Sequence, residues 1–484
     1  MTLPPAPVPR RDPGAEIRAA ARRTADAWRP WAAAWVGIAA VVFLMGAFVI
    51  LDYTFDQDPH RILKVGVGLL ALLAIALIPK VGLVLLPVIT PIVPWIPPAP
   101  VPGLNTLNVL LLTVFGSYAL SRVLRGQPFA RRGRLGGSIG LLLALAGISI
   151  VRGAAAPTGY TYDAAFAGIQ LFRSTTTFST YFIVLAMART RAERHRVTWS
   201  VMVGLLLEAL ITIKFGRTGA GGRAIGTLGQ SNELGGFLAL FSVIAAAIAV
   251  GARRWFEKLI AAIVFVLGTI GIMLSLSRGS FLALLAGLGV VALRSSRWVI
   301  VVLTLSLVSA PLWLPDYVMD RIMSSRVQVE GSDQATVDAA SEARLETWRS
   351  ILLVVSHHPF DGVGFTGLQY VLPDIGNELG LEDVRDTAHN TFLRMLSELG
   401  VIGFAVFLWL LVQCWRLCDA AVKAARWRFD RALAIGACAA TVCMAVSCAF
   451  GDRFWSPILA SSFWVILALV ESSIVDEPSP QAPA

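Results

Sequence analysis

The sequence predicts an all-α polytopic membrane protein with about 12–14 transmembrane helices and one large hydrophilic loop. Of its 484 residues, 56% are hydrophobic and only 15% are charged, which is more apolar surface than a soluble chain of this length buries. Apolar runs of about 20 residues, the length that crosses a bilayer, recur from Trp31 to the C-terminal end. Between these runs, short basic loops alternate with neutral or acidic ones.

The placement of the basic residues sets the predicted orientation. The net charge of +10 would suit a nucleic-acid partner, but the Lys and Arg residues are concentrated in alternate short loops. This is the positive-inside pattern of membrane proteins, so we expect a lipid bilayer and no nucleic acid, with both chain termini in the cytoplasm. The basic loops run from Arg122 to Arg134, Arg189 to Arg196, Arg253 to Lys258, Arg294 to Arg297 and Arg416 to Arg431.

The predicted spans follow from this alternation, taken in chain order. The third is rich in proline and the tenth is short, and if either does not cross the bilayer the count falls within the stated range. The spans lie near residues 31–51, 62–79, 81–97, 104–121, 137–151, 166–188, 198–214, 231–250, 259–276, 280–293, 298–315, 399–415, 432–450 and 457–470.

The same pattern divides the chain into five parts. A basic cytoplasmic arm (residues 1–30) and a cytoplasmic tail (residues 471–484) flank the membrane region. An N-terminal transmembrane bundle (31–315) and a C-terminal set of transmembrane helices (399–470) are separated by a long acid-rich loop at 316–398. The positive-inside rule places this loop on the outer side.

The long loop contains a predicted amphipathic helix rather than disordered chain. Leu345, Trp348, Leu352 and Val355 repeat at helical spacing, and acidic residues near the start favour a helix. Pro359 ends the helix. Gly362 and Gly364 then predict a tight turn, and Arg344 lies near the start of the helix.

A second helix is predicted to begin at Asp386 and Thr387, which are good capping residues. His389 would then fall in its first turn, followed by Asn390. The positive end of the helix dipole favours a neutral imidazole, which can accept a proton as a general base does. The alternative is a structural histidine packed against the apolar face.

Several arginines lie on the outer side, where the positive-inside rule disfavours them. Arg217 and Arg223 occupy a Gly-rich loop, and Arg278 lies at the tip of a hairpin between two apolar runs. The planar guanidinium suits phosphate oxygens, so these side chains are candidates for binding an anion. The alternative is contact with lipid headgroups or with a nearby carboxylate.

Charged residues also occur inside predicted spans. Arg173 and Glu208 lie in the sixth and seventh spans, where a buried ion pair between them is one interpretation and a substrate channel is the other. Asp452, in the last outer loop, could orient a substrate or His389, or it could pair with Arg453.

At this point the chain resembles the bacterial O-antigen ligase/polymerase superfamily. The resemblance covers roughly residues 220 to 405, and it rests on the order and spacing of short motifs. These are Gly226-Thr227…Asn232-Glu233-Leu234-Gly235, Ser277-Arg278-Gly279, Arg344…Trp348…Pro359…Gly362-Val363-Gly364, and His389-Asn390…Leu393…Glu398…Gly400…Gly403.

The resemblance implies an enzyme of the bacterial inner membrane whose active site faces the periplasm. Such enzymes transfer a glycan from an undecaprenyl-pyrophosphate carrier to an acceptor hydroxyl on a glycolipid or another glycan, without a metal or other cofactor. The superfamily's essential arginines and histidine correspond to Arg278, Arg344 and His389. We therefore expect His389 to be the catalytic base, with Arg278, Arg344 and Arg223 binding pyrophosphate and Arg217, Asn390 and Asp452 supporting them.

Three alternatives remain beside an inverting ligase that uses a lipid A core acceptor. The shared motifs do not separate a ligase from a polymerase that joins carrier-linked repeat units. A metal-dependent glycosyltransferase would use Asp56-Gln57-Asp58, a short acidic pattern in the first outer loop. A flippase or other transporter of lipid-linked glycans is the non-enzymatic alternative. The five cysteines lack the spacing of a metal site.

Overall fold

The computed structural model describes residues 66, 70, 72–95, 106–155, 162–216, 218–323, 326–328, 335–337, 339–380 and 387–474. The chain divides into two compact units, residues 1–82 with 112–129 and residues 83–111 with 130–484. The predicted N-terminal arm, the first span and Asp56 to Asp58 lie outside the described residues, as does the tail beyond residue 474. In the smaller unit, the Phe115 and Phe129 rings pack edge to face with their centroids 6.2 Å apart.

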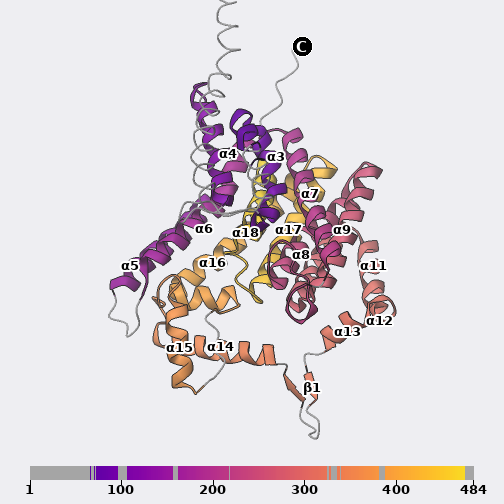
Figure 1. Cartoon of the computed structure of the whole chain (residues 1–484). Helices are drawn as coiled ribbons and strands as arrows, with labels where there is room; N and C mark the ends of the chain where they lie inside the picture. The colour runs from indigo at the N-terminus through magenta and orange to yellow at the C-terminus, as the bar shows by residue number, and fades with distance from the viewer. Residues whose placement is uncertain are drawn as a thin grey trace, which may run out of the picture. The chain divides into compact units, whose positions relative to one another are not determined.

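The prediction of an all-α polytopic membrane protein is confirmed. In the described part of the chain, nine helices are long and apolar enough to cross a membrane. Figure 1 shows how they are arranged. They are α4 (Thr106–Val123), α5 (Gly136–Ala155), α7 (Arg191–Phe215), α8 (Ser231–Gly251), α9 (Trp255–Ser275), α10 (Arg278–Ser295), α16 (Thr391–Ala424), α17 (Arg428–Cys448) and α18 (Pro457–Ile474).

Other predicted spans differ from these nine. The Pro-rich third span forms the short helix α3 (Pro79–Ile89), which continues as the 3-10 helix η1 (Thr90–Trp95). The sixth forms α6 (Ala164–Met187), which is long enough, although Arg173 and a run of Ser and Thr lower its hydropathy. The eleventh does not form one span. It breaks at Ser309 into α11 (Arg297–Val308) and α12 (Ala310–Trp313), because Pro311 lies at the start of the second segment.

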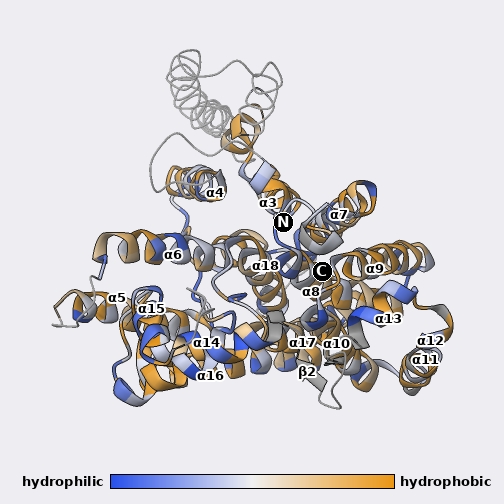
Figure 2. Cartoon of the chain, turned by 60° about the horizontal axis from the view of Figure 1, so that its bottom comes forward, coloured by the Kyte–Doolittle hydropathy of each residue, from blue (hydrophilic) through white to orange (hydrophobic). Residues whose placement is uncertain are grey.

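The larger unit is organised around α8. This helix packs against α9, α10 and α17, and its residues from Leu234 to Ile248 are buried. In contrast, α9 leaves Leu259, Ile263 and Val266 exposed on its other side. Figure 2 shows this hydrophobic colouring on α9 and α11. Apolar side chains facing away from the protein are expected where a helix contacts lipid.

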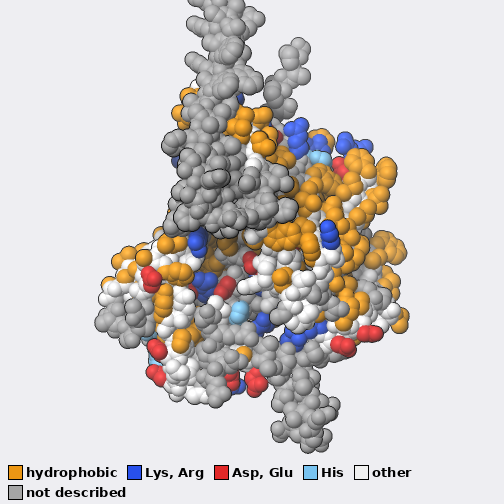
Figure 3. Space-filling view, viewed as in Figure 1, with side chains coloured by type: hydrophobic (Ala, Val, Ile, Leu, Met, Phe, Trp, Pro, Cys, Tyr) orange, Lys and Arg blue, Asp and Glu red, His pale blue; other side chains and the backbone are white. Residues whose placement is uncertain are grey.

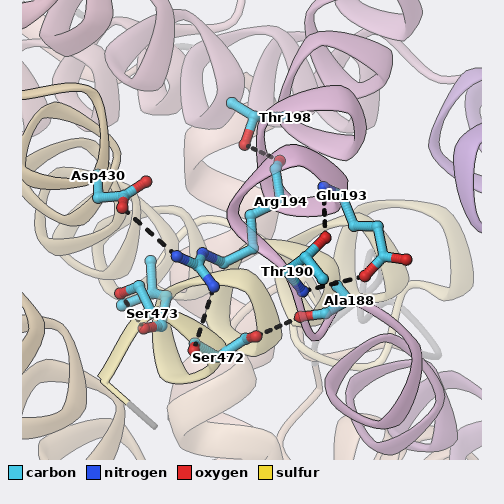
Figure 4. A network of polar contacts seen from close by, with 9 residues as sticks. Ala188, Thr190, Glu193, Arg194, Thr198, Asp430, Ser472 and Ser473 are labelled. Carbon is cyan, nitrogen blue, oxygen red and sulfur yellow. Dashed lines mark hydrogen bonds and ion pairs between the residues drawn. The ribbon is translucent and has the colours of Figure 1, made fainter. Parts of the chain in front are cut away.

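A polar network joins the ends of α7, α17 and α18 (Figure 4). Arg194 is 1% exposed; its guanidinium lies 3.5 Å from Asp430 Oδ2 and also donates to the carbonyl of Ser472. Thr190 and Glu193 form a reciprocal capping box that starts α7 just before this arginine. A buried charge is stable only when it is paired in this way, so the network fixes the relative positions of three helices.

The segment from 316 to 398 contains folded structure, as the sequence predicts. It includes α13 (Asp316–Met323), α14 (Ala339–His357) and α15 (Leu368–Glu378). A two-stranded antiparallel hairpin, β1 (Arg326–Gln328) with β2 (Ala335–Val337), is an element that the sequence analysis did not anticipate. Ile351, Val354, Val363, Leu372 and Ala388 belong to a separate small hydrophobic core that joins α14, α15 and the chain before α16.

A kink at Gly400 joins this segment to α16. Gly400 has φ 66° and ψ −173°, so the helix is interrupted there. The carbonyl groups of Ser397 and Glu398, which the interruption leaves without helical partners, accept hydrogen bonds of 2.8 and 3.1 Å from the backbone of Val363 and Gly364. The predicted turn at Gly362 and Gly364 is confirmed, since both have positive φ. The glycines of this motif therefore build the bend.

We expect Gly400→Ala to destabilise the protein by at least about 2 kcal/mol, because a side chain at this φ is strained and its Cβ would collide with the carbonyl of Phe360. The measurement is thermal unfolding of the purified protein in detergent. Gly289→Ala is the matched control, since a Cβ there meets open space inside α10 and should be neutral or stabilising by up to about 1 kcal/mol. Equal melting temperatures for both variants would contradict the structural role of the kink.

Candidate active site

Three arginines from three other elements lie within electrostatic range of Arg223. Arg223 follows the 3-10 helix η2 (Ala220–Gly222), Arg278 is the first residue of α10, Arg321 lies in α13 and Arg344 lies in α14. Figure 3 shows Lys and Arg side chains gathered below the helix bundle, towards α13, with a histidine side chain beside them. We call these four residues the arginine cluster.

Arg223 is the member whose contacts are best defined. Its guanidinium donates to Asn232 Oδ1 at 2.7 Å and to the carbonyl of Ser275 at 3.0 Å. Both acceptors are neutral. Burial, and after it the positive charges of Arg321, Arg344 and Arg278, together lower the pKa of Arg223 to about 10. A bound anion would relieve this repulsion.

The turn that carries Arg278 is held tightly in place. Leu276 has a left-handed backbone with φ 50°, and the Ala224 amide donates to the Leu274 carbonyl at 2.9 Å. A Cβ on Gly235 of α8 would lie 2.8 Å from Ser275 Oγ, so only glycine lets α8 approach this closely. The motif residues Asn232 and Gly235 therefore position two arginines.

His389 lies just before α16 and not in its first turn, which corrects the prediction from the sequence. The N-cap is Asn390, whose Oδ1 accepts from the amides of Phe392 at 2.9 Å and Leu393 at 3.2 Å. Asn is as good a cap as Asp or Thr, and its side chain satisfies two amides at once. His389 itself is half-buried with φ 46°, and its Nε2 is 3.2 Å from Thr387 Oγ1.

The segment around His389 is anchored on one side by α14. Trp348 Nε1 donates to the Ala388 carbonyl at 2.9 Å. Arg344 precedes Trp348 by one helical turn, so the two side chains project from the same side of α14, about 6 Å apart along its axis. Helix α14 thus contributes Arg344 to the arginine cluster and also contacts Ala388, the neighbour of His389.

A second connection runs through the loop between α17 and α18. Thr391 Oγ1 donates to the Gly451 carbonyl at 2.8 Å. The preceding residue, Phe450, packs so closely on Gly279 that a Cβ there would lie 2.7 Å from the Phe450 side chain. Because Gly279 adjoins Arg278, the structure brings His389, Arg278 and Arg344 into one region from two directions.

Two further residues that the sequence predicted for the site are Arg217 and Asp452. Arg217 lies outside the described residues. Asp452 does not form an ion pair with Arg453; its Oδ2 lies 3.6 Å from Arg394 of α16. Burial is the main influence on the pKa of Arg453 and lowers it. The negative charge of Glu233, followed by that of Asp452, acts in the opposite direction. The sequence analysis missed Arg321, which lies in no motif, and also Arg394, although its spacing of four residues from Glu398 is typical of a helical ion pair.

The suggested pair between Arg173 and Glu208 is wrong. Glu208 accepts from the Thr227 amide at 2.9 Å, and its other oxygen lies 2.5 Å from Thr227 Oγ1. This carboxylate therefore holds the start of the Gly226-Thr227 motif and does not neutralise Arg173. A motif threonine satisfies Glu208 locally, so no distant cation is needed.

Metal-binding residues do not gather in the described part of the chain. No group of three or more His, Cys, Asp or Glu residues there could hold an ion. The cysteines of α16 and α17 are all buried and free. The groups that could neutralise a bound anion in this region are thus the arginines.

Residues 263–408 match the family described as O-antigen ligase. The matched stretch contains Arg278, Arg321, Arg344 and His389, and it confirms the resemblance to the O-antigen ligase/polymerase superfamily. It supports a membrane enzyme of glycan assembly, of ligase or polymerase type. A search of the curated proteins found no match.

The lowered pKa of Arg223 predicts a pH dependence of anion binding. Its positive charge is present below about pH 10 and is lost as the pH rises through that value, so affinity for inorganic pyrophosphate should fall there. Calorimetric titration of the purified protein would measure it. In Arg223→Gln the affinity should be lower and this step absent, because the titrating group has been removed. A step of unchanged size in the variant would contradict the assignment.

Proposed function

We propose that this member of the O-antigen ligase/polymerase superfamily is a glycosyltransferase that uses an undecaprenyl-pyrophosphate-linked glycan as donor. The observation that carries the proposal is the arginine cluster beside His389. Four partly buried guanidinium groups form a site for a multiply charged anion, and His389, whose neighbour Ala388 is held by Trp348 of the helix that carries Arg344, can accept a proton. The chemistry of a pyrophosphate ester attacked by a hydroxyl needs both.

The arginine cluster would stabilise the leaving group. When the bond between the anomeric carbon and the pyrophosphate oxygen breaks, its electron pair stays with the pyrophosphate and the negative charge there increases. Guanidinium groups positioned in advance stabilise this charge more strongly in the transition state than in the ground state. Arg223 is fixed by Asn232 and Ser275 before substrate binds, so it needs little reorganisation.

His389 would act as the general base. The acceptor hydroxyl forms a new bond from its oxygen to the anomeric carbon, and its proton passes to the imidazole. The products are the glycoside and undecaprenyl pyrophosphate, and the imidazolium then returns its proton to water. A single displacement of this kind inverts the configuration of the anomeric carbon. We propose that the acceptor is a sugar hydroxyl, on the lipid A core for a ligase or on a second carrier-linked glycan for a polymerase.

The proposed setting is the bacterial inner membrane, with the segment 316–398 and the arginine cluster facing the periplasm. The distribution of Lys and Arg supports this orientation, since the basic loops belong on the cytoplasmic side. A hydrophilic acceptor and a lipid carrier would then meet at the membrane surface. The aromatic and arginine side chains around the site suit that boundary.

The first test is reconstitution of the full chain with lipid-linked oligosaccharide and a chelator. We expect transfer in the chelator's presence, lower by at least about tenfold in Arg344→Gln because a pyrophosphate contact is lost. Arg349→Gln is the matched control on the exposed side of α14 and should be unaffected.

The same reconstitution distinguishes the two types of enzyme. Longer carrier-linked chains from donor alone identify a polymerase, and product that requires a separate acceptor identifies a ligase. Activity that disappears with chelator would argue for metal chemistry.

Substitution of His389 separates catalysis from folding. His389→Ala and His389→Gly should both lower kcat by about 10²–10⁴-fold with little change in donor KM, because only proton transfer is lost. Glycine tolerates φ 46°, so His389→Gly should be more stable than His389→Ala by about 1 kcal/mol in thermal unfolding. Wild-type rates in either variant would exclude His389 as the base.

A further inference from the structure

A cavity of about 200 Å³ lies beside His389, opposite in chemical character to the arginine cluster. It is formed by the start of α6, the turn before α15, the first turns of α16 and the loop between α17 and α18. Its polar wall comes from Gln170, Thr366, Gln369, Glu398 and Asp452, and Phe166 supplies an apolar side. None of the four arginines of the cluster lines it.

The cavity wall contains hydrogen-bond acceptors that the surrounding residues leave unused. In the described part of the chain, Asp452 Oδ1 and Thr366 Oγ1 are buried and have no hydrogen-bond partner, whereas Glu398 bonds with Arg394 and with the Thr366 backbone. Glu398 is 2% exposed and Thr366 5%. A buried polar atom without a partner is costly, and a native protein retains it where a ligand or ordered water completes the bonding.

The cavity wall carries two carboxylates and one guanidinium, so its formal charge is −1. Arg394 contacts both carboxylates, Glu398 Oε1 at 3.1 Å and Asp452 Oδ2 at 3.6 Å, and so satisfies one oxygen of each. The remaining oxygens accept hydrogen bonds, and the excess of negative charge disfavours an anionic ligand. They suit a neutral ligand rich in hydroxyl donors, while Gln170 and Gln369 can both donate and accept.

The volume of the cavity and the aromatic ring at its edge narrow the class of ligand further. A volume of about 200 Å³ corresponds to roughly seven water molecules at about 30 Å³ each, enough for one sugar ring, and the open side of the cavity leaves room for the rest of a glycan outside it. Phe166 is half-exposed at the edge of the cavity, where an aromatic face can cover the apolar side of such a ring.

The cavity is also connected to the proposed base. Thr387 and Ala388 belong to its wall, and Thr387 Oγ1 is 3.2 Å from His389 Nε2. In the part of the chain that the structure describes, the three non-glycine residues with positive φ are Leu276, Thr366 and His389. One lies in the turn before Arg278, one in the cavity wall and one between them, and such strain is retained where function requires a fixed geometry.

We propose that this cavity binds a sugar ring of the acceptor, with Glu398, Asp452, Thr366 and the two glutamines receiving its hydroxyl groups. The assignment rests on the proposed function. A displacement in line needs the attacking hydroxyl and the leaving pyrophosphate on opposite sides of the anomeric carbon. The arginine cluster takes the pyrophosphate, and the cavity, which none of those four arginines lines, takes the nucleophile.

The kinetic test compares two variants of α15 in the reconstituted full chain. Gln369→Ala removes a cavity contact, whereas Asn377→Ala, at an exposed position of the same helix, is the matched control. We expect Gln369→Ala to raise the KM for the acceptor about tenfold, the loss of one or two hydrogen bonds, with the donor KM unchanged. Thr366→Val, which keeps the shape of the side chain, should do the same. Increased donor KM instead would overturn the assignment.

A binding measurement that does not depend on turnover completes the test. Saturation-transfer NMR with methyl glycosides of neutral hexoses should show contact with the wild-type protein and with Asn377→Ala, and weaker contact with Gln369→Ala. Inorganic pyrophosphate should not compete. Sugar binding without glycan transfer would leave the cavity assignment standing and remove the proposed function. Transfer with no sugar contact and no change in acceptor KM would remove the cavity assignment alone.

Discussion

The fixed position of the chain from Ala388 to Thr391 is the constraint on which the rest of the site depends. Asn390 caps α16, Trp348 of α14 holds the Ala388 carbonyl, and Thr391 holds the loop between α17 and α18. Each contact comes from a different part of the chain. Together they keep His389 in a backbone conformation that an L-residue seldom adopts, next to the cavity residues Thr387 and Ala388.

The bend at Gly400 makes this arrangement compatible with a membrane helix. Without it, the first turns of α16 would continue the axis of the following apolar segment. With it, the backbone of Val363 and Gly364 closes the exposed carbonyls, and the small core around Ile351 and Leu372 can form beside α16. Most glycines of the sequence motifs therefore contribute close approach or positive φ, while the charged and aromatic motif residues supply contacts.

Two environments of opposite character meet at His389. On one side, cations are held near one another at an electrostatic cost, which lowers the pKa of Arg223. On the other, carboxylates share Arg394 and keep free acceptor atoms. An enzyme that joins an anionic donor to a polyhydroxylated acceptor needs this separation. The donor pyrophosphate then binds best at the arginines and the acceptor hydroxyls bind best at the cavity, so an exchange of the two substrates is disfavoured.

Composition and hydropathy alone determined the membrane class and most of the long helices, because about 20 consecutive apolar residues have few alternatives to crossing a bilayer. The motifs also identified Arg278, Arg344 and His389. Only the tertiary structure decided which of several good caps starts α16, that Glu208 binds Thr227, and that Arg321 and Arg394 join the site. Capping signals are short and interchangeable, and ion pairs between residues far apart in sequence leave no periodic pattern, so these contacts emerge only when the helices pack.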